Sequence, residues 1–142
     1  VFKQLPPNNT GLTTHELVTL ASIVEGECLL DRERPIVASV FLNRLKIGQK
    51  LEACATVQYA LGKRTARVLI EDTKIESPYN TYVHEGLPPG PIGCPGEASL
   101  RAVLEPADTS YYYFVAKKDN SGEHVFSKTF DEHKRNKWKL GY

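Results

Sequence analysis

The sequence predicts an α+β fold in which a helical N-terminal half is followed by an irregular Gly/Pro-rich loop, a late β-hairpin and a C-terminal helix. Apolar residues recur with helical periodicity through about residues 13–47. Residues 86–96 hold four prolines and four glycines in eleven positions, so they cannot form a regular element. Aromatic and β-branched residues flank residues 119–122, a good hairpin connection. Helices that precede a hairpin, and do not alternate with strands, indicate the α+β class.

Length and composition predict a single domain. The chain has 142 residues, of which 41% are hydrophobic, enough for one core. We expect residues 1–12 to be an irregular lead-in or linker remnant and residues 13–142 to form the domain. The lack of methionine favours a piece of a longer chain. The formal net charge of +1 argues against a nucleic-acid partner, and no apolar run is long enough to span a membrane.

The helical half is predicted as two helices. The first begins near Thr13, which with Glu16 has the spacing of a capping box, and runs to about Leu30. Its core-facing stripe comprises Leu17, Leu20, Ala21, Val24 and Cys28. The second runs over 34–47, with Pro35 in its first turn and Gly48 as its stop.

The rest of the chain is predicted as short elements. A helix over 55–61 ends at Gly62, and residues 67–83 are expected to be irregular with short strands. The later elements are a helix over 99–104, strands over 111–117 and 124–127, and a last helix over 130–138.

Two carboxylates on the first helix are the main candidates for chemistry. Glu25 and Glu27 lie two residues apart, about 200° around a helix, so they cannot share a proton. Glu25 falls next to the core stripe, whereas Glu27 shares a sector with Glu16. We therefore expect Glu25 to be the desolvated one, in a groove and with a raised pKa, as a proton donor requires. The alternative is that both are surface acids paired with Arg32, Arg34 or Lys46.

The Gly/Pro-rich loop and the segment before it favour a sugar-binding wall. Long loops in compact domains often line binding sites. Residues 77–82 combine tyrosine rings with amide and hydroxyl groups, a mixture that suits sugars. The alternative is a rigid surface loop without function.

Other chemistries have little support in the sequence. The four histidines show no HExxH or other metal-ligand spacing, and neither a GxSxG nor a phosphate-binding glycine pattern occurs, so we expect no metal and no cofactor. Cys28, Cys54 and Cys94 have wide spacings and are interpreted as buried small residues, with a disulfide left open.

Several strings, taken together, resemble the endolytic murein transglycosylases of the YceG-like (MltG) family. They are ASIVEGE at 21–27, VASVFLNRLKIGQKL at 37–51, TVQYALG at 56–62, residues 77–107 with YNTY and GLPPGPI, and residues 111–133. Their order and spacing match the family across nearly the whole chain. One departure is that Cys54 and Ala55 stand where the family usually has Asp-Pro.

The resemblance implies a lysozyme-like active site with Glu25 as the catalytic residue, with Glu27 and Ser22 as supporting residues. It also implies a groove lined or shaped by residues that match further motif positions: Asn43, Arg44, Gln58, Tyr59, Tyr79, Asn80, Thr81, Tyr82, Pro89 and Ile92. The family's domain normally follows a membrane-spanning helix and a small LysM-like module. The implied location is therefore the bacterial cell envelope, with this domain on the periplasmic side of an inner-membrane anchor.

The resemblance further implies a lytic cut of the MurNAc-GlcNAc β-1,4 bond in peptidoglycan, which leaves a 1,6-anhydroMurNAc end. Two alternatives stay open: a hydrolytic muramidase, which needs a second acid such as Glu27, Glu52 or Asp72, and a non-catalytic glycan-binding module. The implied substrate is the peptidoglycan glycan strand, and cell-wall synthases (penicillin-binding proteins) are candidate protein partners.

Overall fold

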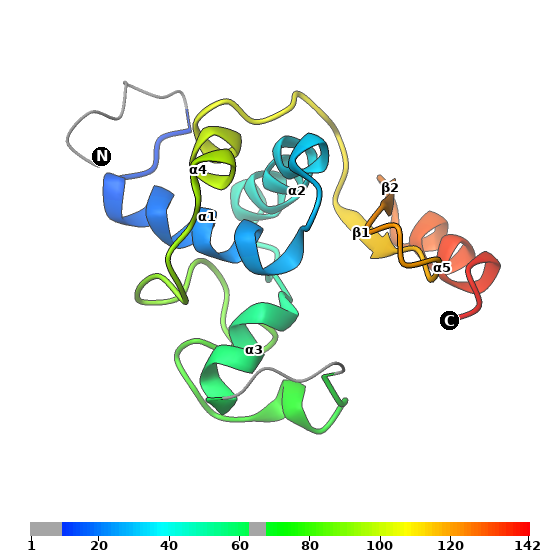
Figure 1. The fold of residues 1–142 in the computed structure, drawn as a ribbon. Coiled ribbons are helices and arrows are strands. Elements are labelled where there is room, and N and C mark those ends of the chain that lie inside the picture. Colours follow the sequence, from blue (N-terminus) through cyan, green and yellow to red (C-terminus); the bar gives the residue numbers. More distant parts are fainter. Residues whose placement is uncertain (1–9, 63–67) are drawn as a thin grey trace.

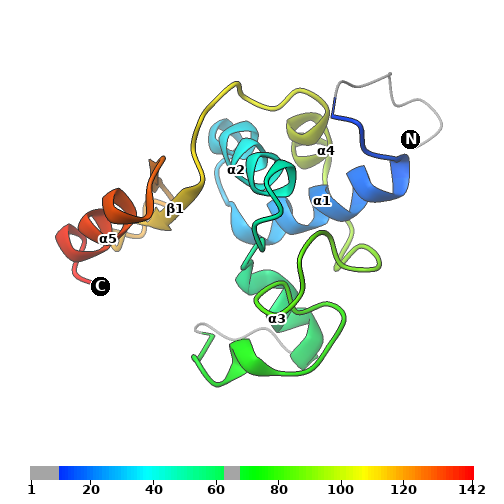
Figure 2. The same ribbon diagram turned by 180° about the vertical axis from the view of Figure 1, so that it is seen from behind.

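A small helical core carries two appended parts in the computed structural model, which describes residues 10–62 and 68–142. Helices α1 (Thr14–Glu27), α2 (Arg34–Lys46) and α4 (Glu97–Leu104) pack against one another in the core, as Figures 1 and 2 show from opposite sides. Helix α3 (Cys54–Leu61) lies below α1 with the green loops, and the C-terminal hairpin lies beside the core. The α+β prediction is confirmed.

Helix α1 begins as predicted and ends earlier. Thr13 and Glu16 form both hydrogen bonds of the capping box. The helix stops at Glu27 because Cys28 is extended, with φ −132° and ψ 129°. Leu29, the residue after Cys28, is 80% exposed. The predicted stripe forms the centre of the core: Leu17, Leu20, Ala21, Val24 and Cys28 are all buried.

The stop signals of α2 and α3 are also confirmed. A short 3₁₀ turn, η2 (Asp31–Glu33), leads into α2, and Pro35 lies in the first turn of that helix. Gly48 and Gly62 follow α2 and α3 with φ of 71° and 76°, left-handed values that glycine adopts without strain.

The prediction of short strands within residues 67–83 is wrong for the described part, 68–83. This segment forms turns and the 3₁₀ turn η3 (Asp72–Lys74). Arg67 lies outside the described residues. The amide of Asn80 explains the difference, since it donates to the carbonyls of Thr73 and Ile75 at 3.0 and 2.8 Å. These carbonyls are satisfied by a side chain and need no strand partner.

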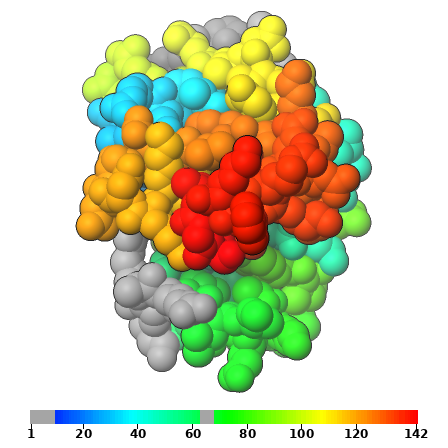
Figure 3. Space-filling view, turned by 90° about the vertical axis from the view of Figure 1, so that its right-hand side faces the viewer, coloured from blue at the N-terminus to red at the C-terminus, as the bar shows by residue number. Residues whose placement is uncertain are grey.

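The hairpin forms as predicted, with β1 (Tyr113–Ala116) antiparallel to β2 (His124–Ser127) and Phe114 opposite Phe126. Helix α5 (Phe130–Lys139) follows, capped by Thr129. The Glu33 carboxylate joins this part to the core, because it lies 2.8 Å from His124 Nδ1 and accepts the His124 N–H at 3.1 Å. In Figure 3, this red and orange segment covers one side of the molecule above the green loops.

Residues 10–12 have no regular structure, and the rest of the predicted lead-in, 1–9, lies outside the described residues. No helix in the described part of the chain has the length and apolar character needed to cross a membrane.

Candidate active site

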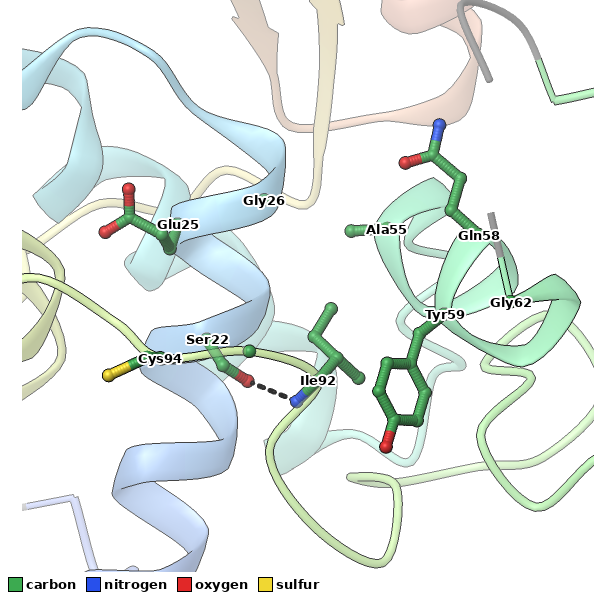
Figure 4. A pocket seen from close by; sticks show the side chains of 10 residues that line it. Ser22, Glu25, Gly26, Ala55, Gln58, Tyr59, Gly62, Ile92 and Cys94 are labelled. Atoms are coloured by element: carbon green, nitrogen blue, oxygen red, sulfur yellow. Dashed lines mark hydrogen bonds between the residues drawn. The ribbon is translucent and has the colours of Figure 1, made fainter. Parts of the chain in front are cut away.

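A pocket of about 420 Å³ lies where α1, α3 and the Gly/Pro-rich loop meet. Its lining includes five residues that the sequence analysis singled out: Ser22, Glu25, Gln58, Tyr59 and Ile92. Figure 4 shows α1 with Glu25 on one side, α3 with Gln58 and Tyr59 on the other, and Ile92 of the loop between them. The expected groove beside Glu25 is therefore present.

The carboxylate of Glu25 is held through one oxygen. Its Oε1 accepts hydrogen bonds from the Gly96 N–H and the Ser99 hydroxyl, each at 2.9 Å. Arg34 Nη1 lies 3.2 Å from the same oxygen. These donors favour the ionised form and hold the pKa of Glu25 below its usual range, with the Gly96 N–H the largest cause. The side chain is still 37% exposed.

The expectation that Glu25 is largely desolvated with a raised pKa is thus wrong. Gly96 is the N-cap of α4 and Ser99 lies in that helix's first turn, so the carboxylate sits at the positive end of α4. The alternative ion pair with Arg34 does form. It is not an ordinary surface pair, because the Arg34 side chain is only 9% exposed.

The upward pKa shift that was expected of Glu25 occurs at Glu27. Its carboxylate accepts the N–H of Ala55, in the first turn of α3, at 2.9 Å. Burial raises the pKa of Glu27 above its usual range, against the smaller opposing effect of this hydrogen bond. Glu16, by contrast, is used in the capping box, where its carboxylate accepts the Thr13 N–H at 3.0 Å. The helical wheel failed here because α3, which covers Glu27, comes from a later segment.

The Gly/Pro-rich loop is attached to α1 at two points. The Ile92 N–H donates to Ser22 Oγ at 3.0 Å, while Ser22 Oγ donates to the Thr19 carbonyl at 2.6 Å. His15 Nε2 lies 2.8 Å from the Pro89 carbonyl, so that nitrogen carries the proton. Pro89 therefore contributes through its backbone and is not among the residues that line the pocket. Ile92 of the loop lines the same pocket as Glu25, and the loop's role as a wall of a glycan groove stays a prediction.

An aromatic pair lies at the α3 side of the pocket. The rings of Tyr59 and Tyr79 have centroids 4.7 Å apart, and Tyr59 is 47% exposed. Tyr79 thus supports a ring that faces the pocket, although it does not itself line the pocket.

Four further predicted groove residues serve the fold instead. The amide of Asn43 donates to the carbonyls of Thr109 and Tyr111, and buried Arg44 donates to those of Leu51 and Tyr112. Asn80 and Thr81 are fully buried, and Thr81 Oγ1 accepts the Ala53 N–H at 2.9 Å. None of the four lines the Glu25 pocket, because backbone carbonyls and N–H groups occupy their polar atoms.

Tyr82 belongs to a different pocket. This second pocket, of about 320 Å³, has Glu27, Cys54 and Tyr82 on one side and the hairpin and α5 on the other. The Tyr82 hydroxyl lies 3.3 Å from Cys54 Sγ, and burial raises the pKa of both groups. The expected position of Tyr82 beside Glu25 is therefore wrong.

The residues that sequence reasoning missed are Gly96 and Ser99. They lie 71 and 74 positions from Glu25, and no local spacing signals the contact. The three cysteines are all within the described residues and are free; Cys28 is buried and Cys94 is exposed. Among the described residues, no group of three His, Cys, Asp or Glu side chains is placed to hold a metal ion.

The fold and the pocket define a small α+β domain with one carboxylate among the described residues that line its groove, and comparison with known proteins gives the family. A family model described as the YceG-like family matches residues 2–139, so the chain belongs to the YceG-like family. A crystal structure of a YceG-like protein from Listeria monocytogenes superimposes with a TM-score of 0.83 at 40% identity, covering 88% of this chain and 40% of that one.

Two curated relatives are named endolytic murein transglycosylase. The protein of Bacillus subtilis is 48% identical over 128 residues, and the protein of Streptococcus pneumoniae R6 is 34% identical over 131 residues. These matches cover 90% and 89% of this chain. The chain spans only 35% and 24% of the relatives' own lengths.

Proposed function

We propose that residues 13–142 form the catalytic unit of a peptidoglycan lytic transglycosylase, with Glu25 as both acid and base. The observation that carries the proposal is that Glu25 is the one carboxylate among the described residues that line the pocket between α1, α3 and the loop. The names of the relatives support murein as the substrate class.

A single carboxylate is sufficient if the substrate supplies the nucleophile. Glu25 donates its proton to the glycosidic oxygen as the bond to C1 of N-acetylmuramic acid breaks. The C6 hydroxyl of the same sugar then attacks C1, gives its proton back to Glu25 and closes the 1,6-anhydro ring. Proximity within one sugar replaces the second carboxylate of ordinary glycosidases.

The low pKa of free Glu25 requires an explanation in this mechanism, because an acid must hold a proton. A glycan lying in the pocket covers the exposed part of the carboxylate and excludes water from it. Desolvation disfavours the charged form and raises the pKa toward the range that a proton donor needs. Glu25 is thus primed to take up a proton when substrate binds.

The hydrolytic alternative needs a second acid near Glu25, and the three candidates lie elsewhere. Glu27 accepts the Ala55 N–H, Glu52 lies 3.7 Å from Arg44, and Asp72 accepts the Leu69 N–H. None of them lines the Glu25 pocket. This arrangement favours the lytic mechanism over hydrolysis.

The proposed setting is the bacterial cell envelope, with glycan strands as substrate. An inner-membrane anchor elsewhere in the protein, with this domain on the periplasmic side, and an association with penicillin-binding proteins are parts of the same proposal. The murein-directed names of the relatives support the envelope as the compartment.

Mass spectrometry of muropeptides from digested sacculi tests the proposal. The wild type is expected to release fragments with anhydro ends, lighter than reducing ends by one water. Glu25→Gln is expected to lower the rate by at least about 100-fold, because it keeps the size of the side chain but removes the transferable proton. Glu27→Gln is expected to cost much less.

Glu97→Gln is the matched control, since Glu97 is an exposed α4 carboxylate paired with Arg101. It should leave the rate unchanged. Predominant reducing ends would replace the lytic mechanism by hydrolysis. An active Glu25→Gln would favour a glycan-binding role or another catalytic residue.

A further inference from the structure

Three helices converge on a single oxygen of Glu25. The carboxylate comes from the last turn of α1, the guanidinium of Arg34 from the start of α2, and the donors of Gly96 and Ser99 from the start of α4. All three contacts, at 3.2, 2.9 and 2.9 Å, are made with Oε1. Among the described residues, none forms a hydrogen bond or ion pair with Oε2.

The donors are themselves fixed. Ser99 is 0% exposed, and its hydroxyl accepts a hydrogen bond from Arg34 Nη1 at 2.6 Å. The Nε atom of Arg34 donates to Asp31 Oδ1 at 3.0 Å, which orients the guanidinium from its other edge. A planar guanidinium held at two edges has little freedom to turn. The oxygen that it meets is therefore also fixed in place.

From this geometry we infer that Arg34 and Ser99 are positioning residues, which anchor Oε1 of Glu25 so that proton exchange with the glycan takes place at Oε2. The inference rests on the proposed function of Glu25. Oε1 already accepts two hydrogen bonds, from the Gly96 N–H and the Ser99 hydroxyl, and is paired with Arg34. The remaining oxygen is the one free to meet a glycosidic oxygen and then the C6 hydroxyl.

The arrangement also couples two properties of the carboxylate. The same donors that orient Glu25 stabilise its ionised form, in agreement with its lowered pKa. Removing a donor should therefore raise the pKa and loosen the orientation together. A purely structural role for Arg34 or Ser99 would change stability without moving the titration of Glu25.

The test is to titrate the Glu25 carboxyl by carbon-13 NMR in the whole chain, with the resonance assigned by its loss in Glu25→Gln. Ser99→Ala is expected to raise the pKa of Glu25 and to move the alkaline limb of the kcat–pH profile, which reports the loss of the Glu25 proton, upward by the same amount. We expect kcat to fall roughly 10-fold, since misorientation of a catalytic group is costly, and KM to change little.

Arg34→Gln should give a larger shift in the same direction, and Arg34→Lys should restore part of the charge effect. Arg101→Gln is the control, because Arg101 is an exposed arginine on the same helix as Ser99. If Arg34→Gln fails to fold, Ser99→Ala still decides the question.

An unchanged pKa of Glu25 in folded Ser99→Ala would overturn the positioning role. A second outcome would reject the proposed function and not the positioning role. If the NMR titration shows a shifted pKa of Glu25 while the kcat–pH profile does not move, Glu25 is not the acid and base.

Discussion

The carboxylate of Glu27, at the end of α1, caps α3 by accepting the backbone N–H of Ala55 at 2.9 Å. Helix α3 has no side-chain cap of its own, since its N-cap residue is Ala53. Glu27 therefore holds in place the helix that carries Gln58 and Tyr59 into the pocket. A helix N-terminus left without such an acceptor has unsatisfied N–H groups.

Replacing Glu27 by Gln should change how stability depends on pH. Burial raises the pKa of Glu27 in the folded state. Between the unfolded and the folded pKa, the folded protein therefore binds more protons than the unfolded chain does. The wild type therefore loses stability as pH rises from the unfolded pKa, about 4.3, up through the folded pKa. Glu27→Gln has no ionisable group at this position and does not lose stability in this way. The difference in the free energy of unfolding, variant minus wild type, should therefore become more positive from pH 4 to pH 7.

Urea unfolding at the two pH values measures this difference. Glu71→Gln, at an exposed position, is the control and should show no such trend. A Glu27→Gln effect that is the same at pH 4 and pH 7 would contradict the raised pKa.

Gly26→Ala should disturb the pocket through a direct clash. A Cβ on Gly26 would lie 2.8 Å from the Cβ of Ala55, and neither atom belongs to a flexible chain. Helices α1 and α3 must then separate, which costs about 1–3 kcal/mol, partly offset by the better helix propensity of alanine. We expect lower stability and a clear loss of activity, measured by thermal unfolding and by anhydro-end release.

Gly93→Ala is the matched control for this clash. Gly93 lines the same pocket, but an added Cβ there meets no atom within 4 Å. Its activity should stay close to that of wild type, and an equal loss in both variants would show that the clash is not the cause.

Tyr59→Ala should weaken glycan binding. The ring of Tyr59 lies against Tyr79 and is half exposed in the pocket, so it can stack on a sugar face. We expect KM to rise about 10-fold, equivalent to about 1.4 kcal/mol, with kcat less affected. Tyr59→Phe should retain most of the affinity. Trp138→Ala, which removes an exposed aromatic side chain from α5, should leave KM unchanged.

Arg44→Leu should act on the fold and not on the substrate. Removing the buried guanidinium leaves the carbonyls of Lys50, Leu51 and Tyr112 without its hydrogen bonds. We expect the free energy of unfolding to fall by about 3 kcal/mol. Lys46→Leu, at an exposed position on the same helix, should have little effect. A KM change in Arg44→Leu without loss of stability would restore the groove role that the sequence predicted.

The sequence by itself determined the local elements. Thr13 and Glu16 specify the start of α1, and Gly48 and Gly62 specify the ends of α2 and α3, because capping and left-handed φ values depend on adjacent residues alone. The antiparallel hairpin also followed from its turn and its strand composition. Periodicity was sufficient to predict which face of α1 forms the core.

The sequence also predicted residues of the groove, in those cases where the motif lies on an element that faces the pocket. Ser22, Glu25, Gln58, Tyr59 and Ile92 all line the pocket. Asn43, Arg44, Asn80 and Thr81 bind the backbone and do not line this pocket, so a role in shaping the groove stays a prediction for them. A polar side chain in a motif has the same appearance in the sequence whether its partner is a ligand or a carbonyl.

The tertiary structure alone decided the electrostatics of the two glutamates. A helical wheel places a side chain relative to its own helix, but a carboxylate responds to every donor and every apolar atom around it. Gly96 and Ser99 reach Glu25 from α4, and α3 covers Glu27. Those neighbours come from segments distant in the chain, so only folding determined that the pKa of Glu25 is lowered and that the pKa of Glu27 is raised.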